Sequence, residues 1–217
     1  MGDPPSNKFL QQAIVNFSME AMCFYAAMSG AQPNKEVFIR DWCAVKLTRE
    51  HKRIVTVETT RSEFRQWFFC TEAQRKAYDE LPLPQNYRID MIIYNPRGDD
   101  TTKAELRALI EFKTNPNPKK VIDDIKRTAG LLYAVRALPD LSEGPRFGYQ
   151  IVCVRYQEKS DIEKDFENLG NLSGRHPCFS LDIAPEAFVI DGIWGDEGKE
   201  TWWGAVFGFK VTGELVT

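Results

Sequence analysis

Two apolar segments in the middle of the chain constrain its fold more than any other feature. Residues 88–95 (RIDMIIYN) and 106–114 (LRALIEFKT) are rich in β-branched and other large apolar residues, and the polar stretch 96–103 (PRGDDTTK) separates them. This pattern predicts two strands joined as an antiparallel hairpin, with the centre of the turn near residues 100–101. The middle of the fold is therefore expected to be a sheet.

Helical segments surround the hairpin and predict a mixed α/β fold with a central mixed sheet flanked by helices. Hydrophobic periodicity predicts helices over 7–29, 35–49, 71–80 and 119–138, and strands over 54–59 and 148–156. Asn34 is a suitable cap for the second helix. We expect residues 1–159 to form one core, with 7–34 as an N-terminal helical extension. Residues 160–217, an acidic helix (160–170) and an aromatic β-rich segment, would pack on that core as a C-terminal extension.

The composition excludes several classes of protein. With 217 residues, 43% hydrophobic and 27% charged, the chain has a globular composition. No apolar run approaches the ~20 residues that span a bilayer, and the N-terminus lacks an apolar signal region, so a cytoplasmic protein without membrane contact is expected. Two histidines, cysteines without C-x-x-C spacing and no glycine-rich phosphate loop leave carboxylates to carry any reaction. Residues 1–159 hold 24 basic and 20 acidic residues, whereas 160–217 hold 4 and 11, so the first part is the one suited to a polyanion.

Each hairpin strand carries an acid among its apolar residues. Because side chains alternate along a strand, Asp90 would lie opposite Glu111, with both carboxylates on one face. Two like charges facing each other on a half-buried sheet are destabilising and need compensation. Lys113 is one candidate partner, and a divalent cation such as Mg²⁺, which prefers oxygen ligands, is the other. With the metal in place, Lys113 would be free to orient or help deprotonate a water, which suits metal-assisted phosphodiester hydrolysis.

The spacing of Glu111 and Lys113 is not specific by itself. The pattern E-x-K also occurs at Glu50 and Glu197, but only the copy at Glu111 lies in an apolar strand that follows a strand with an inward-facing Asp. The competing interpretation is an exposed Asp–Lys–Glu ladder on a solvated sheet face.

The segments RIDMIIYN and ALIEFKT together resemble the PD-(D/E)XK superfamily of restriction-like nucleases. The upstream EVFIR, from Glu36 to Arg40, followed by VTVE, is similar to the N-terminal nuclease part of type I restriction motor subunits and their stand-alone relatives. The resemblance covers about residues 35–156. It implies a restriction-endonuclease-like core of a helix, three antiparallel-type strands, a helix and a further strand.

The same resemblance implies the site. Asp90 and Glu111 would bind Mg²⁺, with Mn²⁺ as a substitute, and the Phe112 backbone carbonyl would be a third ligand. Lys113 would act on the attacking water, and Glu36 would lie near the metal or its water shell. The sequence departs from the family pattern at Ile89, where the family name places a proline.

Several residues have two interpretations. Glu36 in the first turn of a helix also suits the helix dipole, and Glu20 is its rival for the same place near the metal. Glu58 on the preceding strand is either a site acid or a solvated one. Arg40 would pair with Glu36 at i,i+4.

The helix after the hairpin holds a group of basic residues. Lys119 and Lys120 are candidate phosphate contacts, whereas Lys126 and Arg127 are expected on a solvated face. That face would carry the i,i+4 pairs Lys120–Asp124 and Asp123–Arg127.

Three functions follow from this sequence. The first is a Mg²⁺-dependent nuclease acting on DNA, alone, as a homodimer or in a larger restriction or defence assembly. The second is the same fold without activity, used as a nucleic-acid or protein binding module. The third, a structural or assembly protein, would be favoured if Asp90 and Glu111 faced opposite sides of the sheet.

Overall fold

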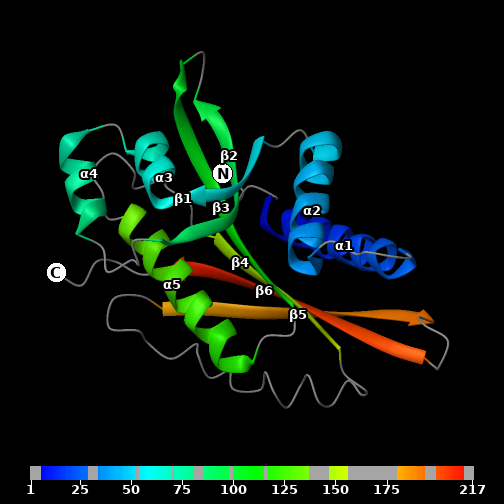
Figure 1. Cartoon of the computed structure of the whole chain (residues 1–217). Coiled ribbons are helices and arrows are strands. Elements are labelled where there is room, and N and C mark those ends of the chain that lie inside the picture. The colour runs from blue at the N-terminus through cyan, green and yellow to red at the C-terminus, as the bar shows by residue number, and fades with distance from the viewer. Residues whose placement is uncertain are drawn as a thin grey trace.

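The computed structural model describes ten segments of the chain: residues 6–28, 34–51, 54–69, 71–80, 86–97, 100–114, 117–136, 147–155, 180–193 and 199–212. In chain order the helices and strands are α1 (Ser6–Ala27), α2 (Lys35–His51), β1 (Ile54–Thr60), α3 (Arg61–Phe68), α4 (Glu72–Asp79), β2 (Arg88–Arg97), β3 (Asp100–Thr114), α5 (Pro118–Arg136), β4 (Phe147–Arg155), β5 (Ser180–Ile193) and β6 (Lys199–Thr212) (Figure 1). The mixed α/β class is confirmed. None of the described helices is long and apolar enough to cross a membrane.

The strands form one sheet in the order β1-β2-β3-β4-β6-β5. The first three are antiparallel neighbours, with α3 and α4 in the connection between β1 and β2 and a short connection between β2 and β3. β4 then pairs parallel with β3, and the connection between them contains α5. β6 pairs antiparallel with both β4 and β5, so the aromatic C-terminal segment continues the sheet. β3 therefore lies between an antiparallel and a parallel neighbour.

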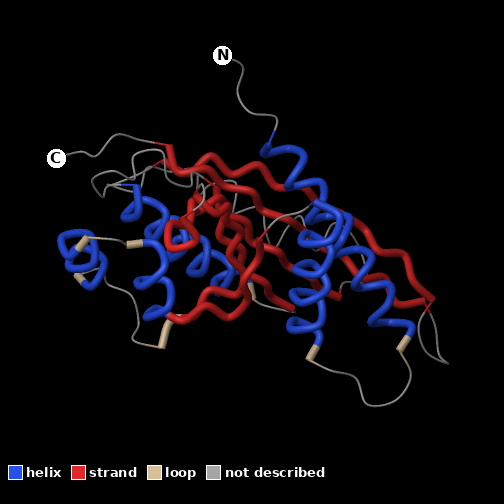
Figure 2. Tube along the Cα trace, turned by 90° about the horizontal axis from the view of Figure 1, so that it is seen from above, coloured by secondary structure: helices blue, strands red, loops and turns tan. Residues whose placement is uncertain are grey.

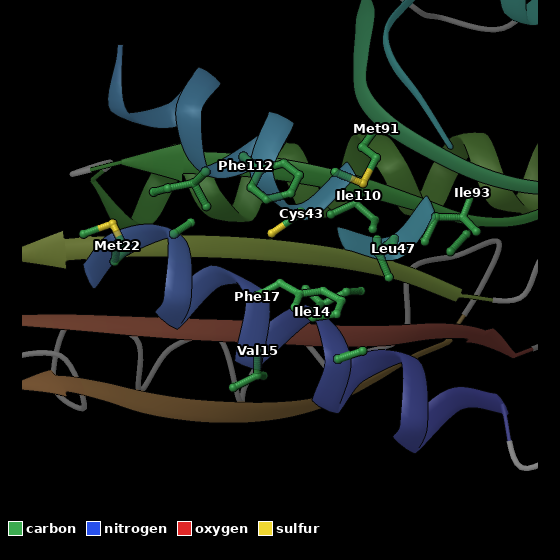
Figure 3. Packing of buried hydrophobic residues seen from close by; sticks show 14 residues of the cluster. Ile14, Val15, Phe17, Met22, Cys43, Leu47, Met91, Ile93, Ile110 and Phe112 are labelled. Atoms are coloured by element: carbon green, nitrogen blue, oxygen red, sulfur yellow. The ribbon is translucent and has the colours of Figure 1, made fainter. Parts of the chain in front are cut away.

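Helices α1 and α2 cover one face of the sheet with an apolar core. Alternate residues of β2 and β3 point into it, because side chains on a strand alternate between faces. The buried cluster includes Met91, Ile93, Ala108, Ile110 and Phe112 from the strands, and Ile14, Phe17, Met22, Cys43 and Leu47 from the helices (Figure 3). This face is closed by apolar packing.

The opposite face of the same strands lies against α3 and α5, and Figure 2 shows helices on both sides of the strands. Ile92 and Leu109 are fully buried on this face, and Val121, Ile125 and Leu132 are buried on α5. The acids Asp90 and Glu111 share the strand parity of Ile92 and Leu109, so they also belong to this face.

The helices and strands predicted from the sequence are present within the described residues, with two differences. The expected strand 106–114 begins earlier, at Asp100. Helix α3 was not predicted. Its signal is a capping box in which Thr60 accepts from the Glu63 backbone while the Glu63 carboxylate accepts from Thr60, and Phe64 and Phe68 are its buried residues. The acidic helix expected over 160–170 lies outside the described residues.

The hairpin register differs from expectation at its tip and agrees with it at its base. At the tip Arg97 pairs with Asp100, so the turn is centred earlier than residues 100–101. Two register shifts, between Ile93 and Tyr94 and between Pro96 and Arg97, separate the tip from the base. At the base Met91 pairs with Ile110, the register that the sequence predicted. The predicted centre of the turn was wrong, whereas the predicted register agrees with the structure as far as the last pair, Met91–Ile110.

Candidate metal and active site

The base of the β2–β3 hairpin brings the two predicted acids together. The last registered pair of β2 and β3 is Met91–Ile110, and Asp90 and Glu111 are the next residues along the two strands. Both side chains lie on the α5 face. The two carboxylates also interact electrostatically. Burial raises the pKa of Glu111, and the negative charge of Asp90 raises it further. The condition that favoured a purely structural protein, acids on opposite faces, is not met.

Lys113 lies at the centre of the site. Its ammonium donates to the Phe112 carbonyl oxygen at 2.9 Å. The same Nζ lies 3.6 Å from Glu36 Oε1, 3.7 Å from Asp90 Oδ2 and 3.6 Å from Asp124 Oδ2. The oxygens of Asp90 and Phe112 that the resemblance assigns to a metal thus converge on a cation that belongs to the chain.

The backbone of β3 holds Asp90 in place. Asp90 Oδ2 accepts a hydrogen bond from the Phe112 amide at 2.8 Å. Phe112 therefore binds Asp90 through its N–H and Lys113 through its carbonyl, while its ring is buried in the apolar core on the other face. The packing of that ring positions the polar groups of the site.

Glu36 reaches the site from the first turn of α2. Asn34 caps this helix as predicted, accepting from the Glu36 amide at 2.9 Å. The Glu36 carboxylate extends to the end of β3, where Oε2 accepts from the Thr114 amide at 3.3 Å and Oε1 lies near Lys113. Glu36 is thus both a first-turn acid and a member of the site.

The two other acids considered for the site, Glu20 and Glu58, form ion pairs away from Lys113. Glu20 pairs with Lys46 at 2.9 Å between α1 and α2. Glu58 has a left-handed backbone, with φ of 50°, and pairs with Arg40 at 2.6 Å, so the predicted Arg40–Glu36 pair is wrong. Arg40 is buried and satisfied by Glu58 and Asp41, which removes its need for Glu36.

Glu111 is the most buried of the site carboxylates, at 2% exposure. Its Oε1 accepts from the Tyr87 hydroxyl at 3.1 Å. Burial raises the pKa of Glu111 well above its usual range, and Asp90 raises it further. A carboxyl in this position holds its proton more strongly than one in water, and a bound cation would reverse that preference.

Helix α5 contributes a carboxylate that the sequence analysis assigned to a solvated face. Asp124 is only 6% exposed, and its carboxylate faces Lys113 and Arg127 instead of Lys120. Arg127 bonds Asp124 rather than Asp123, and its guanidinium lies over the Tyr87 ring at 4.9 Å from the centroid. The two predicted i,i+4 pairs are therefore wrong.

The sequence contained a signal for this error. Hydrophobic spacing predicts Ile122, Ile125, Ala129 and Leu132 as the inward stripe of this helix. The buried residues of α5 begin one position earlier and are Val121, Asp124, Ile125, Thr128, Ala129, Leu131 and Leu132 among those described. Ile122 is only partly buried. Starting the helical stripe at Val121 places Asp124 on the inner face automatically.

The charges of the site balance around Lys113. Burial alone would lower the pKa of Lys113, but Asp90, Glu36, Glu111 and Asp124 together raise it above its usual value. Burial raises the pKa of Glu36, and Asp90 adds to the rise while Lys113 opposes it. Lys113 is consequently an ammonium at neutral pH, and it partly neutralises the surrounding carboxylates.

The site offers the kind of oxygen atoms that bind a divalent cation, but these oxygens surround the Lys113 ammonium. Carboxylate and carbonyl oxygens are the ligands that Mg²⁺ and Mn²⁺ take. One of them, Asp124 Oδ2, is buried without a hydrogen-bond partner. Among the described residues, no three His, Cys, Asp or Glu side chains are grouped so that they could hold one ion as they stand. Binding a metal at Asp90 and Glu111 would therefore require Lys113 to move.

The predicted phosphate contacts lie beside this site. Lys119 and Lys120 are exposed in the first turn of α5, which follows the strand that carries Glu111 and Lys113. Asn117 caps the helix by accepting from the Lys120 amide at 2.9 Å.

Comparison with known proteins gives no match: no family model, curated protein or solved structure is significantly similar to this chain. The geometry of the site therefore carries the functional argument.

Proposed function

We propose that the protein is a Mg²⁺-dependent nuclease that hydrolyses phosphodiester bonds in DNA by metal-activated water. The observation that carries the proposal is the convergence of Asp90, the Phe112 carbonyl and Glu36 on one cation, with Glu111 on the adjacent strand position. A position that stabilises an ammonium among acidic oxygens is also suited to a divalent ion.

The fold supports the same proposal. Helix α2, strands β1 to β3, helix α5 and strand β4 occur in the order that the resemblance to PD-(D/E)XK nucleases implies, with α3 and α4 between β1 and β2. The resemblance places the metal ligands on two adjacent central strands, and Asp90 and Glu111 occupy such strands. Within this proposal, β5 and β6 are an extension of the restriction-endonuclease-like core.

Each residue has a chemical role in the proposed reaction. Asp90, Glu111 and the Phe112 carbonyl would hold the metal, which supplies Lewis-acid stabilisation and a more acidic water. Lys113, as an ammonium, would stabilise the negative charge that develops on the phosphate. Glu36 would accept a hydrogen bond from the attacking water. Lys119 and Lys120 would bind flanking phosphates and position the strand.

The experiment is a cleavage assay with purified protein. Single- and double-stranded DNA and RNA are each incubated with Mg²⁺, with Mn²⁺ and with EDTA. The proposal predicts cleavage of DNA that depends on the metal and is lost in EDTA. Cleavage that persists in EDTA would contradict the metal mechanism, and cleavage of RNA alone would change the substrate.

A second function is favoured by one specific observation. Lys113 already neutralises the acids, and no metal-binding group is formed by the described residues as they stand. A fold that keeps this ion-pair cluster as structure would act as a nucleic-acid or protein binding module. Calorimetric titration distinguishes the two, because such a module would bind DNA without taking up Mg²⁺ or Mn²⁺.

A further inference from the structure

Asp124 is a buried acid that the proposed reaction does not use. Its side chain is 9% exposed, and Oδ2 has no hydrogen-bond partner. A buried carboxylate oxygen without a partner is costly, and a fold retains one only where something compensates for it. Lys113 Nζ lies 3.6 Å from this oxygen, which is beyond hydrogen-bond distance.

The carboxylate of Asp124 is held in a defined orientation. Arg127, one turn further along α5, bonds Oδ1. This contact fixes the carboxylate so that Oδ2 faces Lys113. Arg127 is in turn stacked over the Tyr87 ring, and the Tyr87 hydroxyl donates to Glu111. Asp124 therefore belongs to a network that also reaches the second predicted metal ligand.

Lys113 has two sets of partners. On one side are the Phe112 carbonyl, Asp90 and Glu36, and on the other is Asp124 on α5. The first set includes the oxygens that a divalent cation would take. The lysine side chain has rotatable bonds that allow its ammonium to shift toward Asp124 without a change in the backbone.

We propose that the Lys113 ammonium and a divalent ion use the same oxygens of Asp90 and Phe112, and that Asp124 is the positioning residue that receives the ammonium when the ion binds. The proposal rests on the proposed function, because it assumes a metal at Asp90 and Glu111. On metal binding the ammonium leaves the Asp90 and Glu36 oxygens and bonds Asp124 Oδ2, at a distance of about 2.8 Å. Lys113 thereby stays close to the reacting phosphate and keeps a counter-charge.

The test is a calorimetric titration with Mn²⁺ alone on the full chain and on the variants Lys113→Met, Asp124→Asn and the double variant. Asp124→Asn should weaken Mn²⁺ binding roughly tenfold, as the loss of an outer-shell partner does. In the Lys113→Met background the same change should alter affinity by less than about twofold, because no ammonium remains to be received. Asp123→Asn, an exposed acid on the same helix, is the matched control and should bind like the wild type.

The outcomes separate this inference from the proposed function. An Asp124→Asn effect of equal size in both backgrounds would overturn the inference, because Asp124 would then act as a direct ligand or through its charge alone. An unchanged affinity in Asp124→Asn would overturn it as well. Absence of Mn²⁺ binding in both the wild type and Lys113→Met would instead contradict the proposed metal site itself.

Asp124→Asn removes the negative charge that pairs with the Arg127 guanidinium, so this variant carries a risk of lower stability. The pair Arg127→Gln and Asp124→Asn/Arg127→Gln provides the same comparison without a guanidinium that has lost its carboxylate. The double variant should bind Mn²⁺ roughly tenfold more weakly than Arg127→Gln. Equal affinities in this pair would also overturn the proposal.

Discussion

The two faces of the β2–β3 hairpin use the same backbone for opposite purposes. Under α1 and α2 the alternate residues Met91, Ile93, Ile110 and Phe112 are buried among apolar side chains. On the α5 side Ile92 and Leu109 are also buried, but the base of the hairpin carries Asp90, Glu111 and Lys113, and α5 adds Asp124. One face stabilises by excluding water, and the other buries charge.

Under the proposed function, the apolar face contributes stability and the charged cluster contributes chemistry. Burying ion pairs contributes little to stability relative to apolar residues of similar volume, and often costs some. The apolar face shows that this hairpin accommodates such residues. A buried cluster of acids around one lysine at its base is therefore better explained by a function than by folding, and the variants below test that division.

The largest effect on cleavage is expected from a substitution of Asp90. Asp90→Asn removes the negative charge but keeps an oxygen that accepts from the Phe112 amide, so the fold should be maintained. Metal-dependent cleavage should fall by about 10³-fold or more, because the proposed metal loses a charged ligand. Rates are measured on labelled DNA with Mg²⁺.

The matched control is Glu58→Gln, an exposed acid on the neighbouring strand β1 whose partners are Arg40 and Arg88. It should cleave at close to the wild-type rate. Full activity in Asp90→Asn would assign the reaction, if any, to other residues.

Adjacent residues of β3 should separate stability from activity. Ile110→Ala, on the apolar face, should lower the free energy of unfolding by about 3 kcal/mol through lost burial and a cavity. Glu111→Gln, one residue later, should leave stability unchanged or raise it while it abolishes cleavage, since its amide oxygen still accepts from Tyr87. Urea unfolding and the cleavage assay measure both. A loss of stability in Glu111→Gln as large as in Ile110→Ala would show that the charged face is structural.

The buried acid also predicts a dependence of stability on pH. The folded protein holds the Glu111 proton to a higher pH than the unfolded chain, because burial raises the pKa of Glu111 well above the usual 4.5. In EDTA, the contribution of Glu111 to the free energy of unfolding is fully present below pH 4.5, the usual pKa of the group in the unfolded chain. It falls as pH rises toward the folded pKa, by up to about 1.4 kcal/mol per pH unit.

The measurement is urea unfolding of the metal-free protein at several pH values, compared with Glu111→Gln. The variant should lose less stability than the wild type as pH rises, because its amide does not titrate. Parallel curves for the two proteins would mean that Glu111 is not held protonated by burial.

The smallest effect is expected at the surface next to the site. Lys119→Gln and Lys120→Gln should each weaken DNA binding a few-fold and reduce the salt slope of log K by about 0.9. Lys126→Gln, exposed further along α5, is the control and should change neither. Binding is measured by fluorescence anisotropy at several salt concentrations. Equal effects at all three lysines would indicate a diffuse basic surface instead of a local phosphate contact.

The sequence predicted the strands, and the shared face of Asp90 and Glu111, because both depend on local pattern. Alternation along apolar strands determines which residues share a face. The register Met91–Ile110 agrees with the prediction even though the turn is centred earlier than predicted. Asn34 as a helix cap was equally local. In each case the information lay within a few residues of sequence.

What the sequence analysis missed depends on contacts between distant segments. Asp124 is assigned to the site by how α5 packs on β3, and a shift of one residue in the helical stripe was enough to place it in solvent. Arg40 pairs with Glu58, 18 residues away, instead of with Glu36 one turn away. The link from Tyr87 to Glu111 spans 24 residues and has no local signal.

The measurement that tests the central claim most directly is a crystal structure of the protein grown with saturating Mn²⁺, with anomalous scattering recorded at the manganese edge. The account predicts a single peak at the base of the hairpin, about 2.1 Å from oxygens of Asp90 and Glu111 and from the Phe112 carbonyl. The absence of any peak there, with Lys113 still bonded to the Phe112 carbonyl, would contradict it.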